Sequence, residues 1–210
     1  MKLIFDIYLY TFEMIIAFLF ISHNYDSKQN KVYKSLLIGF CIFITGALVL
    51  KFVNNDILNL AVFLIINFTF FRLCFKIKLK EAVIYAVLLD AIMFGTEMIT
   101  IYFASYIMKI PTNTYKTDII TFHILATISK VMYFVISQLI AFIINKLKFR
   151  NNNSTRYIPL FMFPVLSIAI AYLFLRMSFA NNYSTSYNIG FMVLNILMII
   201  ASIYIFVYYQ

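Results

Sequence analysis

Long hydrophobic runs separated by short polar connections dominate the pattern along the chain. A helix needs roughly 20 mostly apolar residues to cross the hydrocarbon core of a bilayer. Runs of about this length predict seven membrane-spanning helices, whereas a transmembrane barrel would show alternating segments of roughly ten residues. The predicted spans are Leu3–Ser22, Ser35–Val53, Ile57–Phe75, Ala82–Met108, Ile119–Ile144, Ile158–Ala180 and Ile189–Tyr208.

The pattern therefore predicts an all-α fold, a polytopic membrane helix bundle with about seven transmembrane helices. Six spans are the alternative, because Asn54, Asn55 and Asp56 leave only a tight turn before the third run. A re-entrant hairpin at that point would change the topology. Since no repeat or linker divides the sequence, we expect one transmembrane domain over residues 1–210.

Composition supports a lipid environment. Hydrophobic residues make up 64% of the chain and charged residues 12%. A soluble domain carries roughly 45–50% apolar and about 25% charged residues. The excess is too large for a water-exposed surface, so we expect a multi-pass protein of the cell membrane whose first partner is the lipid bilayer.

The basic residues indicate the orientation. A net charge of +9 would suggest nucleic acid in a soluble protein, but here these residues lie in connections between apolar runs. The first, third and fifth connections hold eleven Lys and Arg, against five on the opposite side. The positive-inside rule places the richer side in the cytoplasm. We therefore expect the N-terminus outside, the C-terminus inside, and no nucleic-acid partner.

Five ionisable residues fall inside the predicted spans. Placing such a side chain in the centre of a membrane-spanning helix costs roughly 2.5–3.5 kcal/mol on insertion scales, so its presence requires an explanation. Antiparallel neighbours place Glu97 and Lys130 at a matched depth, roughly 16 Å below the outer surface. An ion pair between them would either fix the register of the helices or line a polar pocket open to the outside. The five are Glu13, Asp90, Glu97, His123 and Lys130.

These residues define the candidate site, an intramembrane polar network or ligand pocket. His123 precedes Lys130 by seven residues, which puts both on one helix face, although a single His is more often an interfacial residue. Glu13 falls in the outer half of its span and could converge with them. Asp90 lies on the same helix face as Glu97 but nearer the cytoplasm. Asn67 is expected to hydrogen-bond a neighbouring helix.

No catalytic or metal-binding pattern accompanies these residues. The sequence holds no Gly-rich phosphate loop, no G-x-S-x-G and no H-E-x-x-H. Cys41 and Cys74 match no metal motif, so neither a metal nor a cofactor is expected. The chain ends at Gln210, just past the last predicted span. We therefore expect no enzymatic activity in this chain.

Several segments resemble the sensor region of the accessory-gene-regulator (AgrC-like) sensor histidine kinases, which are GHKL-class receptors of Gram-positive bacteria. The similarity covers most of the chain in layout. It is carried by Leu60–Met108 with its Asn67, Lys76–Glu81 (KIKLKE) and Glu97, by Ile128–Phe134 leading into the basic loop Asn145–Arg156, and by Ile158–Pro164.

The resemblance implies a receptor in two-component quorum sensing. Such a region would bind a small secreted peptide pheromone at its outer loops and outer pocket. Its last helix would pass the change to a cytoplasmic histidine kinase in a homodimer. No phosphoacceptor-His region or ATP-binding motif follows Gln210, so we expect either a chain from which the kinase part is missing or a stand-alone relative.

Two other functions fit a small basic helical membrane protein. The substrate-binding subunit of an energy-coupling-factor transporter usually has six spans and Gly/Ala-rich helix contacts, yet only Gly39, Gly46, Gly95 and Gly190 occur here. A membrane peptidase that matures such pheromones needs a His to activate a Cys thiolate. His23 and Cys74 are its candidates, but no His is followed by a Cys at about seven residues.

Overall fold

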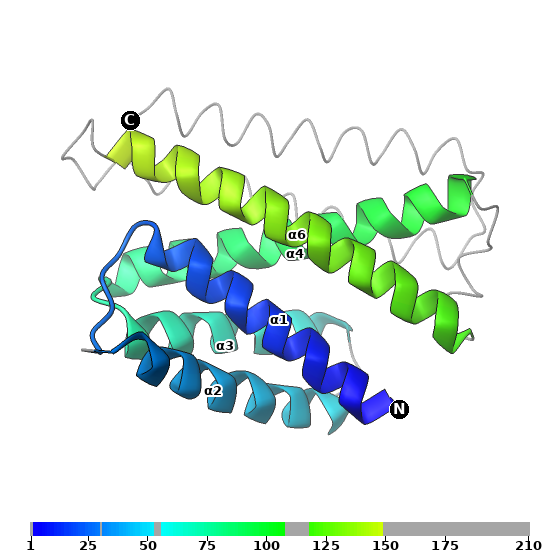
Figure 1. The fold of residues 1–210 in the computed structure, drawn as a ribbon, viewed down its shortest axis with the longest axis horizontal. Coiled ribbons are helices and arrows are strands. Elements are labelled where there is room, and N and C mark those ends of the chain that lie inside the picture. The colour runs from blue at the N-terminus through cyan, green and yellow to red at the C-terminus, as the bar shows by residue number, and fades with distance from the viewer. Residues whose placement is uncertain (1, 30, 53–55, 108–117, 149–210) are drawn as a thin grey trace. The chain divides into compact units, whose positions relative to one another are not determined.

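A computed structural model describes residues 2–29, 31–52, 56–107 and 118–148, and every regular element in these ranges is an α-helix. The first five predicted spans match these helices to within a few residues at each end. The predicted spans Ile158–Ala180 and Ile189–Tyr208 lie outside the described residues. The helices are α1 (Lys2–Ser22), α2 (Val32–Phe52), α3 (Asp56–Cys74), α4 (Leu79–Ile107) and α6 (Ile119–Lys148) (Figure 1).

Four of these helices are long and apolar enough to cross a membrane, as judged by length and composition. The qualifying stretches are Phe5–Ser22, Val32–Leu50, Leu79–Ile101 and Ile120–Lys146. The third helix is continuous over 19 residues, but its apolar part, Ala61–Cys74, is shorter. For the described residues, the expectation of an all-helical chain with helices suited to a membrane is thus confirmed, whereas the number of seven spans stays a prediction.

The chain packs as two compact units, and α4 and α6 each contribute to both. The first unit comprises Met1–Asp90 and Tyr133–Asn145, and the second comprises Ala91–Met132 and Lys146–Gln210. Helices α1, α2 and α3 belong to the first unit. The expected single domain over residues 1–210 stays a prediction.

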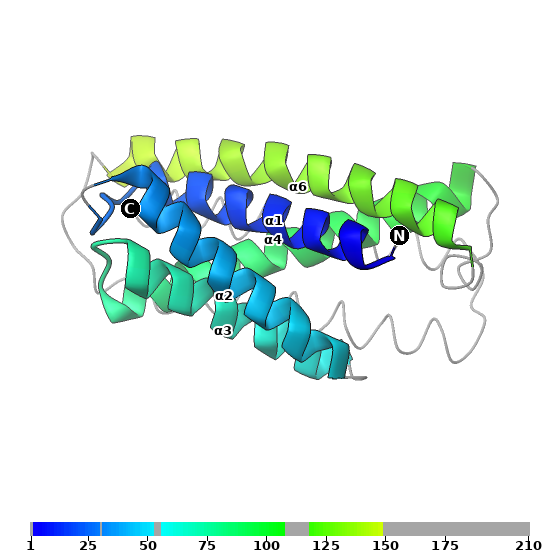
Figure 2. The ribbon, with the colours of Figure 1, turned by 60° about the horizontal axis from the view of Figure 1, so that its bottom comes forward.

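Aromatic side chains build the core of the first unit. Helix α2 packs against both α1 and α3, as two views of the ribbon show (Figures 1 and 2). The fully buried ring of Phe70 meets Phe43 edge-on at 5.8 Å and Phe75 at 5.9 Å between centroids. Pairs of this geometry contribute about 0.5–1.5 kcal/mol beyond the area they bury. One aromatic cluster therefore joins α2, α3 and the chain that follows α3.

Two glycines allow α2 to approach α3 closely. A Cβ atom on Gly39 would lie 2.6 Å from Cε2 of Phe70, and one on Gly46 would overlap Ile66. Small residues at helix contacts are a common solution in membranes, where packing rather than hydrophobic burial drives association. The two positions are seven residues apart and thus share one face of α2.

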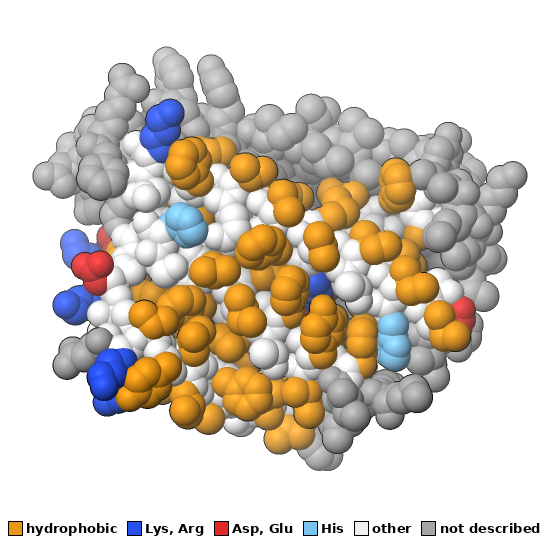
Figure 3. Space-filling view, in the orientation of Figure 1, with side chains coloured by type: hydrophobic (Ala, Val, Ile, Leu, Met, Phe, Trp, Pro, Cys, Tyr) orange, Lys and Arg blue, Asp and Glu red, His pale blue; other side chains and the backbone are white. Residues whose placement is uncertain are grey.

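Large hydrophobic side chains cover the outward face of the first unit. The space-filling view shows mainly hydrophobic side chains over α1 and α2, with Lys and Arg at the end where these two helices are connected (Figure 3). Soluble monomers rarely expose continuous apolar surface beyond a few hundred Å². This face therefore suits lipid. Its exposed residues include Ile7, Tyr8, Ile15, Leu37, Phe40 and Leu48.

In the second unit, Asp118 fixes the start of α6. Its carboxylate accepts hydrogen bonds from the Ile120 backbone N–H at 3.1 Å and from the Thr121 hydroxyl. Of these two bonds, the one from the Ile120 N–H is that of a helix N-cap, which satisfies backbone N–H groups that lack a partner within the helix. Both bonds also lower the pKa of the exposed Asp118 carboxyl, the Thr121 hydroxyl contributing most.

Candidate functional site

An ion pair joins α4 to α6 within the second unit. Lys130 Nζ of α6 donates to Glu97 Oε1 of α4 at 2.6 Å. A second contact lies close by in sequence, because the Thr100 hydroxyl is 3.7 Å from the Met132 sulfur. The pairing of Glu97 with Lys130 that their matched depth predicts is confirmed.

The two members of the pair differ in exposure. The Lys130 side chain is 6% exposed and the Glu97 side chain 40%. The buried Thr96 and Thr100 hydroxyls beside Glu97 donate to carbonyls of their own helix, those of Met93 and Thr96, each at 2.8 Å. The Lys130 side chain is therefore held inside, while part of the Glu97 side chain stays accessible.

His123 lies on α6, seven residues before Lys130, and is partly buried. Its ring stands 5.9 Å from the Phe122 ring, and its backbone carbonyl accepts the Thr127 hydroxyl at 2.8 Å. His123, Lys130 and Glu97 thus all belong to the second unit.

The first unit also holds a polar group, in which the Asn67 amide of α3 donates to Asp90 Oδ1 of α4 at 2.6 Å. Asp90 is fully buried, Asn67 is 2% exposed and Glu13 of α1 is 5% exposed. Glu13 interacts electrostatically with Asp90. The helix-to-helix hydrogen bond expected of Asn67 is present, and its partner is one of the candidate residues.

The five candidate residues are divided between the two units. Glu13 and Asp90 interact in the first unit, and Glu97, Lys130 and His123 belong to the second. A single outer pocket formed by Glu13 with Glu97, His123 and Lys130 stays a prediction. Among the residues the structure describes, no group of three His, Cys, Asp or Glu side chains could hold a metal ion.

The connection between α1 and α2 pairs with the connection between α3 and α4. Ser27 and Phe75 form an antiparallel bridge. The Lys28 N–H donates to the Cys74 carbonyl at 2.8 Å, and the Lys76 N–H to the Asp26 carbonyl at 2.9 Å. Two connections that sequence alone assigns to one side of the membrane thus lie together at one end of the first unit.

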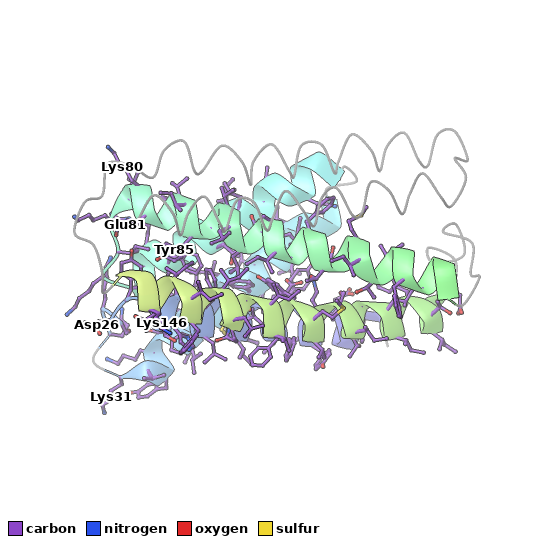
Figure 4. The ribbon with its side chains drawn as sticks, turned by 90° about the horizontal axis from the view of Figure 1, so that it is seen from above. Asp26, Lys31, Lys80, Glu81, Tyr85 and Lys146 are labelled. Atoms are coloured by element: carbon purple, nitrogen blue, oxygen red, sulfur yellow. The ribbon has the colours of Figure 1, made fainter. Side chains whose placement is uncertain are left out.

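Side chains lock the same end. The Tyr25 phenol donates to Glu81 of α4 at 3.0 Å, and its ring meets Tyr85 edge-on at 5.4 Å. Figure 4 shows Glu81 and Tyr85 on α4 at the end where Asp26 and Lys31 also lie. Burial, followed by the electrostatic effects of Tyr85 and Glu81, raises the pKa of Tyr25 well above its ordinary value. Sequence analysis missed this cluster, because its members are separated in the chain and carry no motif.

The cysteine and histidine of the peptidase alternative have other partners. The buried Cys74 thiol donates to the Ser35 carbonyl at 3.6 Å. A ring nitrogen of the exposed His23 lies 2.7 Å from the Leu19 carbonyl. Neither side chain makes the Cys–His hydrogen bond that activation of a thiolate requires.

Comparison with known proteins identified no relative, because no family model, no curated protein and no solved structure matches the chain.

Proposed function

We propose that this chain is a receptor of the bacterial cell membrane that detects a small extracellular peptide and signals to a cytoplasmic histidine kinase. In this proposal it crosses the membrane about seven times, with its N-terminus outside. Four helices with the length and composition of membrane spans support the location. The resemblance of Leu60–Met108 and of Ile128–Pro164 to AgrC-like sensor regions suggests the ligand class and the kinase partner.

The basic end of the first unit supports the orientation. Two paired connections bring Lys28, Lys31 and Lys34 together with Lys76, Lys78 and Lys80 at that end. The Asn24 amide also donates to the Ala141 carbonyl at 3.4 Å, which brings the C-terminal part of α6 to it. By the positive-inside rule this end faces the cytoplasm. The opposite ends of the helices then face outward.

The observation that carries the proposal is the ion pair of Glu97 and Lys130. The Glu97 side chain is 40% exposed although α4 is a candidate membrane span. A charge that faced hydrocarbon there would cost roughly 2.5–3.5 kcal/mol or more. The exposed part of Glu97 is therefore better explained by a polar cavity, which water fills until a ligand enters. A peptide could then engage this carboxylate directly.

Cysteine labelling tests the cavity. In a background with Cys41→Ala and Cys74→Ala, we expect a membrane-impermeant maleimide added outside intact cells to label a cysteine placed by Glu97→Cys. The matched control is Ile128→Cys, at an apolar position of α6 that is exposed at 46% and suited to lipid; it should stay unlabelled. Equal protection of both positions would contradict an open cavity.

A chimera tests the signalling. The chain would be joined after Gln210 to the cytoplasmic part of a GHKL-class histidine kinase and placed in nanodiscs. We expect the small-peptide fraction of spent medium from cells of the source organism to change autophosphorylation, and Glu97→Gln to weaken the response. Unchanged autophosphorylation with every fraction, despite external labelling at position 97, would reject the peptide receptor but keep the cavity.

A further inference from the structure

Among the residues that the structure describes, the buried pair of Asp90 and Asn67 leaves one oxygen on each side chain without a hydrogen bond. Asn67 Nδ2 donates to Asp90 Oδ1 at 2.6 Å. Within the part of the chain that the structure describes, Asp90 Oδ2 and Asn67 Oδ1 are buried and accept no hydrogen bond. Leaving a buried polar atom unsatisfied costs about 1–3 kcal/mol, and more for a charged group. Two such atoms on already bonded groups need an explanation.

An ionised Asp90 cannot satisfy the two oxygens that lack a hydrogen bond. A carboxylate has only acceptors, and the remaining amide oxygen of Asn67 is also an acceptor. Turning the amide over would only exchange its oxygen and nitrogen, so that one acceptor would again face another. As long as Asp90 is ionised, these two side chains can form one hydrogen bond between them and not two.

One added proton satisfies both atoms. A protonated carboxyl gains an O–H donor and keeps its acceptor oxygen. The O–H on Asp90 Oδ2 can donate to Asn67 Oδ1 while Asn67 Nδ2 continues to donate to Asp90 Oδ1. The acid and the amide then form a closed pair of two opposed hydrogen bonds. No further group is needed.

The surroundings favour the neutral acid. Asp90 is completely buried, with 0% of its surface accessible. Helix α3 offers it the neutral Asn67, and the group that acts on it from α1 is a second acid, Glu13, rather than a cation. An ionised carboxylate in an apolar interior instead requires a paired cation or several donors. Removing the charge by protonation is the ordinary outcome for such a group.

We propose that Asp90 is a proton-binding site, and that its proton bridges Asp90 Oδ2 to Asn67 Oδ1 and ties α4 to α3 at neutral pH. The bound ligand is a proton, and the site is independent of the peptide receptor proposed above. It also explains how an acidic residue for which the described residues show no ion pair can occupy the centre of a helix suited to a membrane.

Infrared spectroscopy on the full chain in nanodiscs tests the proton directly. At neutral pH we expect the carbonyl band of a protonated carboxyl, shifted in D2O and lost in Asp90→Asn. Asp26→Asn, at an exposed acid of the first connection, is the control and should keep the band. No band assignable to Asp90 would overturn the proposal. A band that is present in choline chloride but lost in sodium chloride would overturn it as well, because a sodium ion would then hold the site.

Measurements of stability distinguish a proton shared between Asp90 and Asn67 from a negatively charged Asp90. Asp90→Asn keeps one donor and one acceptor opposite Asn67, so the unfolding equilibrium should change by less than about threefold. Asn67→Leu removes both partners from the acid and should shift that equilibrium by about tenfold or more. If Asp90→Asn were as harmful as Asn67→Leu, Asp90 would act through a negative charge, and the proton bridge would be wrong.

Discussion

Lys130 of α6 and Glu97 of α4 form a 2.6 Å ion pair in which the Lys130 side chain is buried and the Glu97 side chain is 40% exposed. This asymmetry predicts unequal effects of breaking the pair. Glu97→Gln withdraws a carboxylate from a buried ammonium and should lower the free energy of unfolding by about 3 kcal/mol. Lys130→Met should have a smaller effect, because the partly exposed Glu97 side chain is less confined and can be solvated more easily. Chemical unfolding in matched lipid or detergent measures both.

The double variant is the control for this pair. Glu97→Gln combined with Lys130→Met removes both charges, so its loss should be smaller than the sum of the two single losses. Additive losses would mean that the two charges do not act on each other. A larger loss from Lys130→Met than from Glu97→Gln would contradict the assigned exposures.

The close approach of α2 to α3 predicts that alanine destabilises the chain at Gly39 and Gly46. Helix propensity alone predicts a gain of about 1 kcal/mol when Gly is replaced by Ala. We expect a net loss of about 1–3 kcal/mol instead, because the new Cβ atoms would overlap Phe70 and Ile66. Cys41→Ala, at an exposed position of α2, should have little effect. A gain at Gly46 would show that the helices are farther apart.

The hydrophobic pattern predicts the helices well because run length is a local property of the chain. Runs such as Leu3–Ser22 and Ile119–Ile144 match α1 and α6 within a few residues. The third run is the least regular, since Asp56 begins α3 and only Ala61–Cys74 is strongly apolar. Composition indicates that the helices suit a lipid environment, but it carries no information on which helices pack against each other.

Side-chain partners were predictable only where depth and charge coincide. The pairing of Glu97 with Lys130 follows from opposite charges at a matched depth on consecutive helices. The pairing of Asn67 with Asp90 does not follow, because an amide has many possible partners at this depth. The Tyr25–Glu81 hydrogen bond depends on how two connections fold against each other. The hydrophobic pattern gives no information on the structure of connections.

The raised pKa of the buried Tyr25 phenol predicts that the protein loses stability at high pH. Burial raises its pKa in the folded state above the ordinary value of 10.0. The neutral phenol is therefore favoured by folding, its contribution is fully present below about pH 10, and it is lost as pH rises further. Tyr25→Phe should cost about 1 kcal/mol at neutral pH through the lost bond to Glu81. Above pH 10 the stabilities of the two proteins should converge, and a difference that grows instead would contradict the shift.

The pairing of the first and third connections makes a prediction about topology. Ser27 and Phe75 are bridged, so exposed positions in both connections must lie on one side of the membrane. In the cysteine-free background, Lys31→Cys and Lys78→Cys should both resist an external impermeant maleimide and react after the membrane is opened. Because seven spans place the last residue on that side too, a reporter fused after Gln210 should also be cytoplasmic. An external reporter with protected cysteines would reduce the number of spans to an even one, and external labelling of both cysteines would reverse the orientation.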